Sequence, residues 1–380
     1  MGQPFPSRCL LCGKEEESIN HLFLDCNYSK KIWRHFLNIS GPQPNLLGPI
    51  SNVIFNWENQ DHRRIIAASL VNGVYIQEKN RINRGEQPKT LAPPWWEYFN
   101  FELVRPIRDD NCSIFAAIYK FNLPPVGCSS PKYVIAFRGT INSTNCSLDF
   151  GKNIQLVRNN FHRASRCEIG VEEVSNLVDA DEGSTIWIVG HSLGSSVGLH
   201  VGKTMAIKGI RLETFLFNPP HISISVPIQW IESETIKSVI HISRSIFKAG
   251  FVKLLRSKSQ RQNTEVKFLE ACEWLPSLFV HRDDVICSKY IEYFEGRDVM
   301  EKLGLGEQER LAMQHTRRCL FLHKPGPEYE PSHLIPSARL ITNQTRLLPN
   351  KAHGLKQWWS SEMTLLSKEY IFGNPNASES

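Results

Sequence analysis

One short stretch of the chain has the residue types and spacing of a nucleophile held on a sharp turn. The apolar residues 186–189 run into Gly190-His191-Ser192-Leu193-Gly194, and small residues at helical spacing follow. This order predicts a strand, a tight turn and a helix, with Ser192 raised above the end of the strand. Glycine suits both ends of the turn, because a side chain there would crowd the crossing of strand and helix. The pattern favours Ser192 as an attacking hydroxyl, and an ordinary glycine-rich turn is the competing interpretation.

A hydroxyl that attacks a carbonyl carbon needs fixed donors for the oxyanion that forms. One donor is usually the N–H of the residue after the nucleophile, here Leu193, and the other comes from the loop after an earlier strand. Residues 132–137 have the composition of such a strand, and Arg138-Gly139-Thr140 follows them. We therefore expect the N–H of Thr140 to be the second donor, with its hydroxyl as a further candidate.

The same chemistry needs a histidine that takes the serine proton and a carboxylate that orients this histidine. Where the nucleophile lies on a Gly-x-Ser-x-Gly turn, the acid and then the histidine follow it along the chain. The apolar residues 277–280 lead to Asp283 and Asp284, so either residue is a candidate acid. Among the 13 histidines, His191 is disfavoured because it lies within the turn, and His281 because it precedes the acid.

A second group of residues, near the N-terminus, has the composition of a metal site. Cys9, Cys12, His21 and Cys26 follow the spacing Cys-x2-Cys-x8-His-x4-Cys. Four such ligands can surround one tetrahedral Zn²⁺. A segment this short buries too little apolar surface to fold alone, so the metal would supply its folding free energy. We expect a structural zinc within residues 1–40, and no cofactor for catalysis.

The elements that must position Ser192 are predicted from the periodicity of the apolar residues. Helical spacing covers 61–79 and 163–178, and strand-like runs cover 113–120, 132–137, 213–217 and 277–280. Helices that alternate with strands are typical of an α/β fold with a mostly parallel sheet and flanking helices. The aromatic residues at 93–99 favour buried packing over the lining of a lipid pocket.

The length and composition of the chain indicate its domain organisation. At 380 residues, with 41% hydrophobic and 22% charged residues, the chain is typical of a globular protein with one large domain and a small appendage. Proline and glycine at 41–57 predict a linker between the segment 1–40 and a domain at 58–372, and 373–380 is expected to be a disordered tail.

Charge and hydropathy limit the partners and the location. A net charge of +6 is too mild to favour nucleic acid. No apolar run has the length of a membrane span, and the N-terminus has no secretory signal, so we expect a cytoplasmic protein with reduced thiols. The basic and apolar segment 243–262 favours a solvated helix; a lid, or weak contact with an anionic membrane surface, is the alternative.

Two motifs of the large domain resemble a known family. Ala136-Phe137-Arg138-Gly139-Thr140 and Gly190-His191-Ser192-Leu193-Gly194 are similar to motifs of class-three (fungal-type) lipases, which are α/β-hydrolases. The stretches 92–97, 217–220 and 352–359 resemble more closely a plant group named GDSL esterase/lipase. The nucleophile motif here is nevertheless Gly-His-Ser-Leu-Gly, not Gly-Asp-Ser-Leu. The resemblance extends over about residues 55–372.

This resemblance implies an α/β-hydrolase fold and an ester hydrolase of the carboxylesterase or triacylglycerol lipase type, which acts through an acyl-enzyme on a lipid or small ester. It aligns Asp284 with the family's acid, and Asp283 is the fallback. It aligns His353 with the family's histidine, and His333 is the main rival. A hydrolase fold that only binds a ligand is the alternative function.

Residues 6–40 resemble the zinc-binding tail that follows the reverse transcriptase of plant retroelements. The resemblance implies contact with nucleic acid, but no polymerase motif accompanies the segment and its charges are nearly balanced. We therefore interpret it as a fused, retroelement-derived segment and expect no nucleic-acid partner.

Overall fold

The computed structural model describes residues 57, 59–83, 95–122, 130–141, 161–181, 183–221, 269–303, 335–359 and 363–372. All of them belong to the second of two units into which the chain divides, Met1–Phe55 and Asn56–Ser380. The predicted zinc ligands, basic segment and tail lie outside the described residues, and so do His333 and the predicted linker apart from Trp57. Trp57, the last residue of that linker, is buried against Trp187 and therefore packs with the large domain.

Eight strands of this described part form one mixed sheet in the order in which they occur along the chain. Strands β3 to β7 are parallel to one another, and β1, β2 and β8 add antiparallel pairs at the two edges. The strands are β1 (Phe101–Arg108), β2 (Ile114–Phe121), β3 (Tyr133–Phe137), β4 (Ile186–His191), β5 (Glu213–Phe217), β6 (Ser277–His281), β7 (Ala338–Asn343) and β8 (Leu365–Tyr370).

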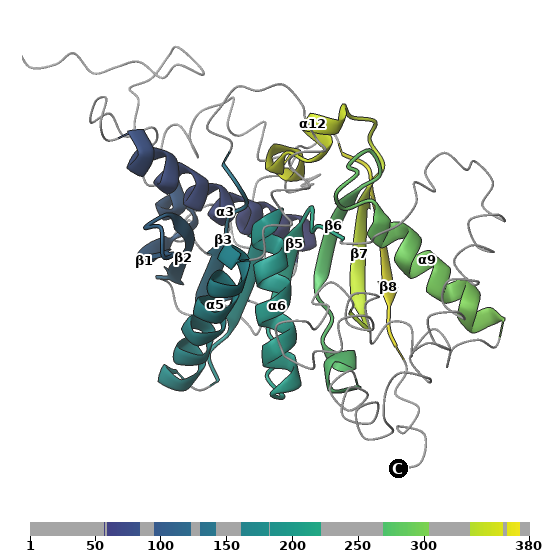
Figure 1. The fold of residues 1–380 in the computed structure, drawn as a ribbon, viewed down its shortest axis with the longest axis horizontal. Helices are drawn as coiled ribbons and strands as arrows, with labels where there is room; N and C mark the ends of the chain where they lie inside the picture. The colour runs from purple at the N-terminus through teal and green to yellow at the C-terminus, as the bar shows by residue number, and fades with distance from the viewer. Residues whose placement is uncertain are drawn as a thin grey trace, which may run out of the picture. The chain divides into compact units, whose positions relative to one another are not determined.

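Helices cover both faces of the sheet. Figure 1 shows α5 (Phe161–Ala180) and α6 (Leu193–Ile207) side by side over one face, with α9 (Lys289–Lys302) farther along the sheet. The long helix α3 (Gln60–Asn83) packs on β2, β3 and β4. The short elements are η2 (Trp95–Phe99), η4 (Ala271–Glu273), α12 (Pro349–Ala352) and η6 (Leu355–Trp359).

The alternation of side chains along β4 explains why both faces are covered. Ile188 faces α6, where a Cβ on Gly198 would lie 3.2 Å from it. Its neighbour Trp187 points to the opposite face, where the Arg63 guanidinium of α3 lies 5.1 Å from the ring. Successive residues of a strand point to opposite faces, so an apolar run in a parallel sheet needs cover on both. These contacts place α3 and α6 on opposite faces.

Strands β2 to β6 and helices α3, α5 and α6 lie close to their predicted positions. The structure therefore confirms the α/β class and the mostly parallel sheet. Strands β1, β7 and β8 and helix α9 were missed by the sequence analysis. Strand β8 has the burial pattern of an exposed edge, and its Ser-Lys-Glu centre carries no apolar alternation. None of the helices in the described ranges is long and apolar enough to cross a membrane.

Candidate active site

Ser192 lies on a strained turn between β4 and α6. Its backbone φ is 54° and ψ is −123°, a conformation that costs a non-glycine residue about 1–3 kcal/mol. Three backbone hydrogen bonds hold it: the Ser192 N–H donates to the carbonyl of Phe217 at 2.9 Å, and the Ser192 carbonyl accepts from the N–H groups of Ser195 at 2.9 Å and Ser196 at 3.3 Å. The neighbouring strand β5 and the first turn of α6 therefore fix this turn between a strand and a helix. We call residues 190–194 the nucleophile turn, after the predicted role of Ser192.

The two glycines of the turn are required by close backbone contacts. A Cβ on Gly194 would lie 2.3 Å from the carbonyl oxygen of Phe137, and a Cβ on Gly190 would lie 2.7 Å from the carbonyl oxygen of Gly194. Neither contact can be relieved by moving a flexible side chain. Strand β4 and helix α6 therefore cross as closely as the glycine pattern implies.

A continuous hydrogen-bond chain joins Ser192 to His353 and Asp284. The Ser192 Oγ lies 2.9 Å from Nε2 of His353, and Nδ1 of the same ring lies 2.9 Å from Oδ2 of Asp284. A carboxylate only accepts, so Nδ1 carries the ring proton and Nε2 is left to accept the serine hydroxyl proton. The structure thus brings together three residues that are 69 and 161 positions apart along the chain.

Asp284 is fully buried and surrounded by donors. Its Oδ2 accepts from the Asn218 amide at 2.8 Å and from the Cys287 thiol at 3.0 Å, and its Oδ1 accepts from the Ile286 N–H at 3.0 Å. Burial alone raises the pKa of a carboxyl group, but hydrogen bonds and the charge of His353 outweigh it, so that the pKa of Asp284 falls below its usual value. Asp284 therefore stays ionised and holds His353 in one tautomer.

Asn218 links the ends of several elements. It follows β5 with a positive φ of 49°, which asparagine tolerates better than most residues. Its amide nitrogen donates to Asp284 and, at 2.9 Å, to the carbonyl of Ala352; its oxygen accepts from the Trp358 indole at 2.7 Å. One fully buried side chain thus joins the acid to the segment that carries His353.

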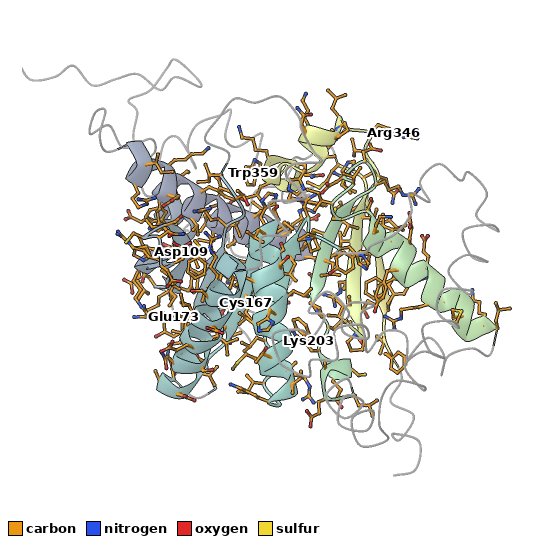
Figure 2. The ribbon with its side chains drawn as sticks, viewed as in Figure 1. Asp109, Cys167, Glu173, Lys203, Arg346 and Trp359 are labelled. Carbon is orange, nitrogen blue, oxygen red and sulfur yellow. The ribbon has the colours of Figure 1, made fainter. Side chains whose placement is uncertain are left out.

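The segment with His353 is anchored on both sides of the histidine. Gln357 of η6 donates to the carbonyl of Ala352 and accepts from Asn343 at 3.1 Å. Arg64 of α3 donates to the Trp358 carbonyl at 2.9 Å. Figure 2 shows Arg346 and Trp359 at the same end of the molecule as α12, whereas Lys203 lies lower on α6. We call residues 348–359 the base loop.

Of the two predicted oxyanion donors, Leu193 directly follows Ser192, and Thr140 follows Gly139, which lies beside Ser192. Leu193 is the first residue of α6, so its N–H has no carbonyl partner within the helix. Thr140 is exposed just beyond β3, in a segment that Arg138 fixes: the buried guanidinium donates to the carbonyls of Ile114 and Gly139, each at 2.6 Å. A Cβ on Gly139 would lie 2.9 Å from the Cβ of Ser192. We call 138–140 the oxyanion loop.

The other candidates from the sequence lie elsewhere. The Asp283 carboxylate accepts from the Leu347 N–H at 3.1 Å, and His281 Nδ1 accepts from the Asp283 N–H at 3.0 Å. The structure thus gives Asp284, not Asp283, the contact with His353. Trp96 of the aromatic group is half-buried, and its ring lies 5.9 Å from that of Tyr119.

Sequence reasoning missed several residues that support this site, among them Asn218, Cys287 and Tyr75. Asn218 lies in one of the stretches that carry the family resemblance, and an asparagine directly after a buried strand is a recognisable signal. Cys287 stands among scattered cysteines and Tyr75 in an amphipathic helix, where neither differs from an ordinary core residue. Only their contacts distinguish them.

Two comparisons with known proteins show what this chain is similar to. Residues 1–33 match the family model described as zinc-binding in reverse transcriptase. A protein of Arabidopsis thaliana named GDSL esterase/lipase is 39% identical over 346 residues, which cover 86% of this chain and 97% of the relative. Identity at this level, over nearly the whole of both chains, shows common descent, and the chain belongs to the family of this GDSL esterase/lipase.

Proposed function

We propose that this protein is a serine carboxylic ester hydrolase with an α/β-hydrolase fold, which acts through an acyl-enzyme on a lipid or small ester. The observation that carries the proposal is the chain of hydrogen bonds from Ser192 through His353 to buried Asp284, with 2.9 Å at each step. The relationship to a GDSL esterase/lipase supports the same reaction class. A carboxylesterase and a lipase differ in the ester that they accept, and both would use this site.

The geometry leads to a two-step reaction. Ser192 Oγ attacks the ester carbonyl carbon while its proton passes to Nε2 of His353. The N–H groups of Leu193 and Thr140 receive the oxyanion. When the intermediate collapses, the alcohol leaves with the proton from His353, and the acyl group remains on Ser192. Water then attacks the acyl carbon and gives a proton to His353. When this second intermediate collapses, His353 returns the proton to Ser192 Oγ, and the acid is released.

The alternative, a hydrolase fold that only binds a ligand, would be favoured by a serine beyond the reach of every histidine. Ser192 Oγ instead lies at hydrogen-bond distance from His353. The strained backbone of Ser192 also supports catalysis, since strain of this kind clusters at active sites.

The test combines hydrolysis with labelling. The purified protein is assayed with p-nitrophenyl esters of short and long chain, and with a fluorophosphonate, which reacts with activated serines. We expect turnover and labelling in the wild type, and loss of both in Ser192→Ala. Ser175→Ala on α5 is the matched control, because that hydroxyl contacts only the Met205 sulfur, at 3.8 Å, among the described hydrogen bonds. Equal rates in wild type and Ser192→Ala would refute the proposal.

A further inference from the structure

Tyr75 of α3 and His191 of β4 form a hydrogen-bonded pair to which the mechanism above assigns no role. Tyr75 Oη lies 2.8 Å from Nδ1 of His191. At one end of the pair, the Gly139 N–H donates to Tyr75 Oη at 2.7 Å. At the other end, Nε2 of His191 lies 2.9 Å from the backbone carbonyl of His353. The pair therefore connects the oxyanion loop, the nucleophile turn and the base loop.

The groups at the two ends of this series of hydrogen bonds determine where each of its protons lies. A carbonyl oxygen only accepts, so Nε2 of His191 must carry hydrogen and donate to His353. A backbone N–H only donates, so the Tyr75 oxygen accepts from Gly139 and its single hydrogen is left for Nδ1 of His191. Each group then has a matching partner, and only one tautomer of His191 satisfies the set.

This arrangement requires His191 to be neutral. The ring is buried, and burial, followed by the nearby charge of His353, lowers the pKa of His191 to about 3. Burial also raises the pKa of the Tyr75 hydroxyl well above its usual value. Neither group changes its charge near neutral pH, so this series of hydrogen bonds acts as a fixed connection and not as a proton switch.

The position of these hydrogen bonds indicates a role in the reaction. Gly139 precedes the proposed oxyanion donor Thr140, His191 precedes the nucleophile, and His353 is the proposed base. The space around Gly139 is also tight, because a Cβ there would lie 2.6 Å from Tyr75 Oη. A shift of the pair would therefore move the donor segment or the base relative to Ser192. Misplacement by about 1 Å can cost about 10²-fold in rate.

We propose that Tyr75 and His191 are positioning residues, which hold the oxyanion loop and the base loop in register on the nucleophile turn without touching the substrate. This inference rests on the proposed ester hydrolase function. It extends that proposal, because it gives α3, on the face of the sheet opposite to α6, a part in aligning the reacting groups.

The first test is Tyr75→Phe in the full-length protein, with Tyr119→Phe as the matched control. Both changes remove one hydroxyl that hydrogen-bonds at α3, since Tyr119 Oη accepts from Gln77 of that helix at 3.0 Å. Among the described hydrogen bonds, the Tyr119 hydroxyl makes none to the oxyanion loop, the nucleophile turn or the base loop. We expect Tyr75→Phe to lower kcat about 10- to 10²-fold with little change in KM, and Tyr119→Phe to leave both near wild type at a similar melting temperature.

The second test compares His191→Gln with His191→Phe. A glutamine amide offers one donor and one acceptor, as the neutral imidazole does, whereas phenylalanine keeps a planar ring and loses both. If His191 acts through its hydrogen bonds, Gln retains more of the fluorophosphonate labelling rate than Phe. If the ring only fills space, Phe retains more than Gln.

The outcomes separate the two proposals. If the wild type is active, two results would overturn the positioning role and leave the hydrolase function intact. One is an equal kcat for Tyr75→Phe and Tyr119→Phe. The other is a higher labelling rate for His191→Phe than for His191→Gln. A wild type that neither hydrolyses esters nor labels would remove the hydrolase, and with it the positioning role. Circular dichroism and melting curves of each variant show whether a lost rate merely reflects unfolding.

Discussion

The side-chain amide nitrogen of Asn218 donates both to Oδ2 of Asp284, at 2.8 Å, and to the carbonyl of Ala352, the residue before His353, at 2.9 Å. A buried amide thus sets the spacing between the acid and the base loop. We expect this contact, together with the charge of Asp284, to make the orientation of His353 specific.

Asn218→Asp should therefore impair both activity and folding. The change removes a donor to two oxygens and places a second carboxyl beside Asp284, so that one of the two pKa values must rise strongly. We expect kcat to fall about 10²-fold or more, and the free energy of unfolding to fall by about 1–3 kcal/mol. Ester kinetics and urea unfolding measure the two effects, and wild-type kcat in this variant would contradict the assigned role of Asn218.

Asp284→Asn and Asp283→Asn should have very different effects. Asp284 contacts Nδ1 of His353, and an amide there would favour the wrong tautomer, for which we expect a loss of about 10³- to 10⁴-fold in kcat. Asp283 contacts the Leu347 N–H, and its carboxylate lies 3.8 Å from the exposed Arg346, so Asp283→Asn should stay within about 3-fold of wild type. Steady-state kinetics of the pair decide the assignment, which would be reversed if Asp283→Asn were the inactive variant.

Cys287 should act through its S–H and not through its volume alone. Burial and the adjacent Asp284 raise the pKa of the thiol, so it stays protonated and donates to Asp284 at 3.0 Å. Cys287→Ala removes this donor and should raise the pKa of Asp284 toward its usual value, while Cys287→Ser keeps a donor.

The sign of the resulting pH effect follows from the lowered pKa of Asp284. Such a carboxyl stabilises the folded state fully above its unfolded pKa, and this contribution is lost as the pH falls through the folded value. The acid unfolding midpoint of Cys287→Ala should therefore lie at higher pH than that of Cys287→Ser. Fluorescence-monitored acid titration measures the midpoints, and identical values would show that the thiol contributes nothing to the ionisation of Asp284.

His191 should make the folded state sensitive to mild acid. Its folded pKa of about 3 lies below the usual histidine value of 6.5, so between these two values the unfolded chain binds a proton that the folded chain does not. Stability from this residue is complete above pH 6.5 and falls at about 1.4 kcal/mol per pH unit below it, a loss of about 2 kcal/mol at pH 5.

His191→Gln removes this titration, whereas Tyr75, His353 and Asp284 around the ring remain. We therefore expect a flatter dependence of the free energy of unfolding on pH in this variant. Urea unfolding at a series of pH values checks it. Parallel curves for wild type and variant would mean that His191 is already protonated in the folded protein.

A chain that begins at Asn56 should retain ester hydrolysis. The division between the two units falls after Phe55, and the truncated chain keeps Trp57, whose ring packs on Trp187 at 5.5 Å. We expect kcat/KM within about 2-fold of the full chain, and a bound-zinc signal only in the full chain, from the predicted ligands Cys9, Cys12, His21 and Cys26. Metal analysis and ester kinetics test the two statements separately. Loss of hydrolysis on truncation would show that the N-terminal segment serves the site.

The sequence alone was sufficient for the local parts of this protein. The strand, turn and helix around Ser192 were predictable because the glycines of the turn are required by close contacts, Gly190 with Gly194 and Gly194 with the end of the neighbouring strand β3. The apolar runs of β3 to β6 were recognisable because a parallel strand is buried on both faces and therefore reads as continuous apolar sequence. The family resemblance added His353 and Asp284, but periodicity did not distinguish Asp284 from Asp283.

The tertiary structure decided what depends on residues that are distant along the chain. Strand β8 carries Ser, Lys and Glu on an exposed edge, and its pairing with β7 supplies order that its composition does not predict. Cys287, Tyr75 and His191 resemble ordinary polar or core residues until their partners are known. Hydrogen bonds are directional and short, so the choice of the acid, the tautomer of His353 and the connection between the loops follow only from the three-dimensional arrangement.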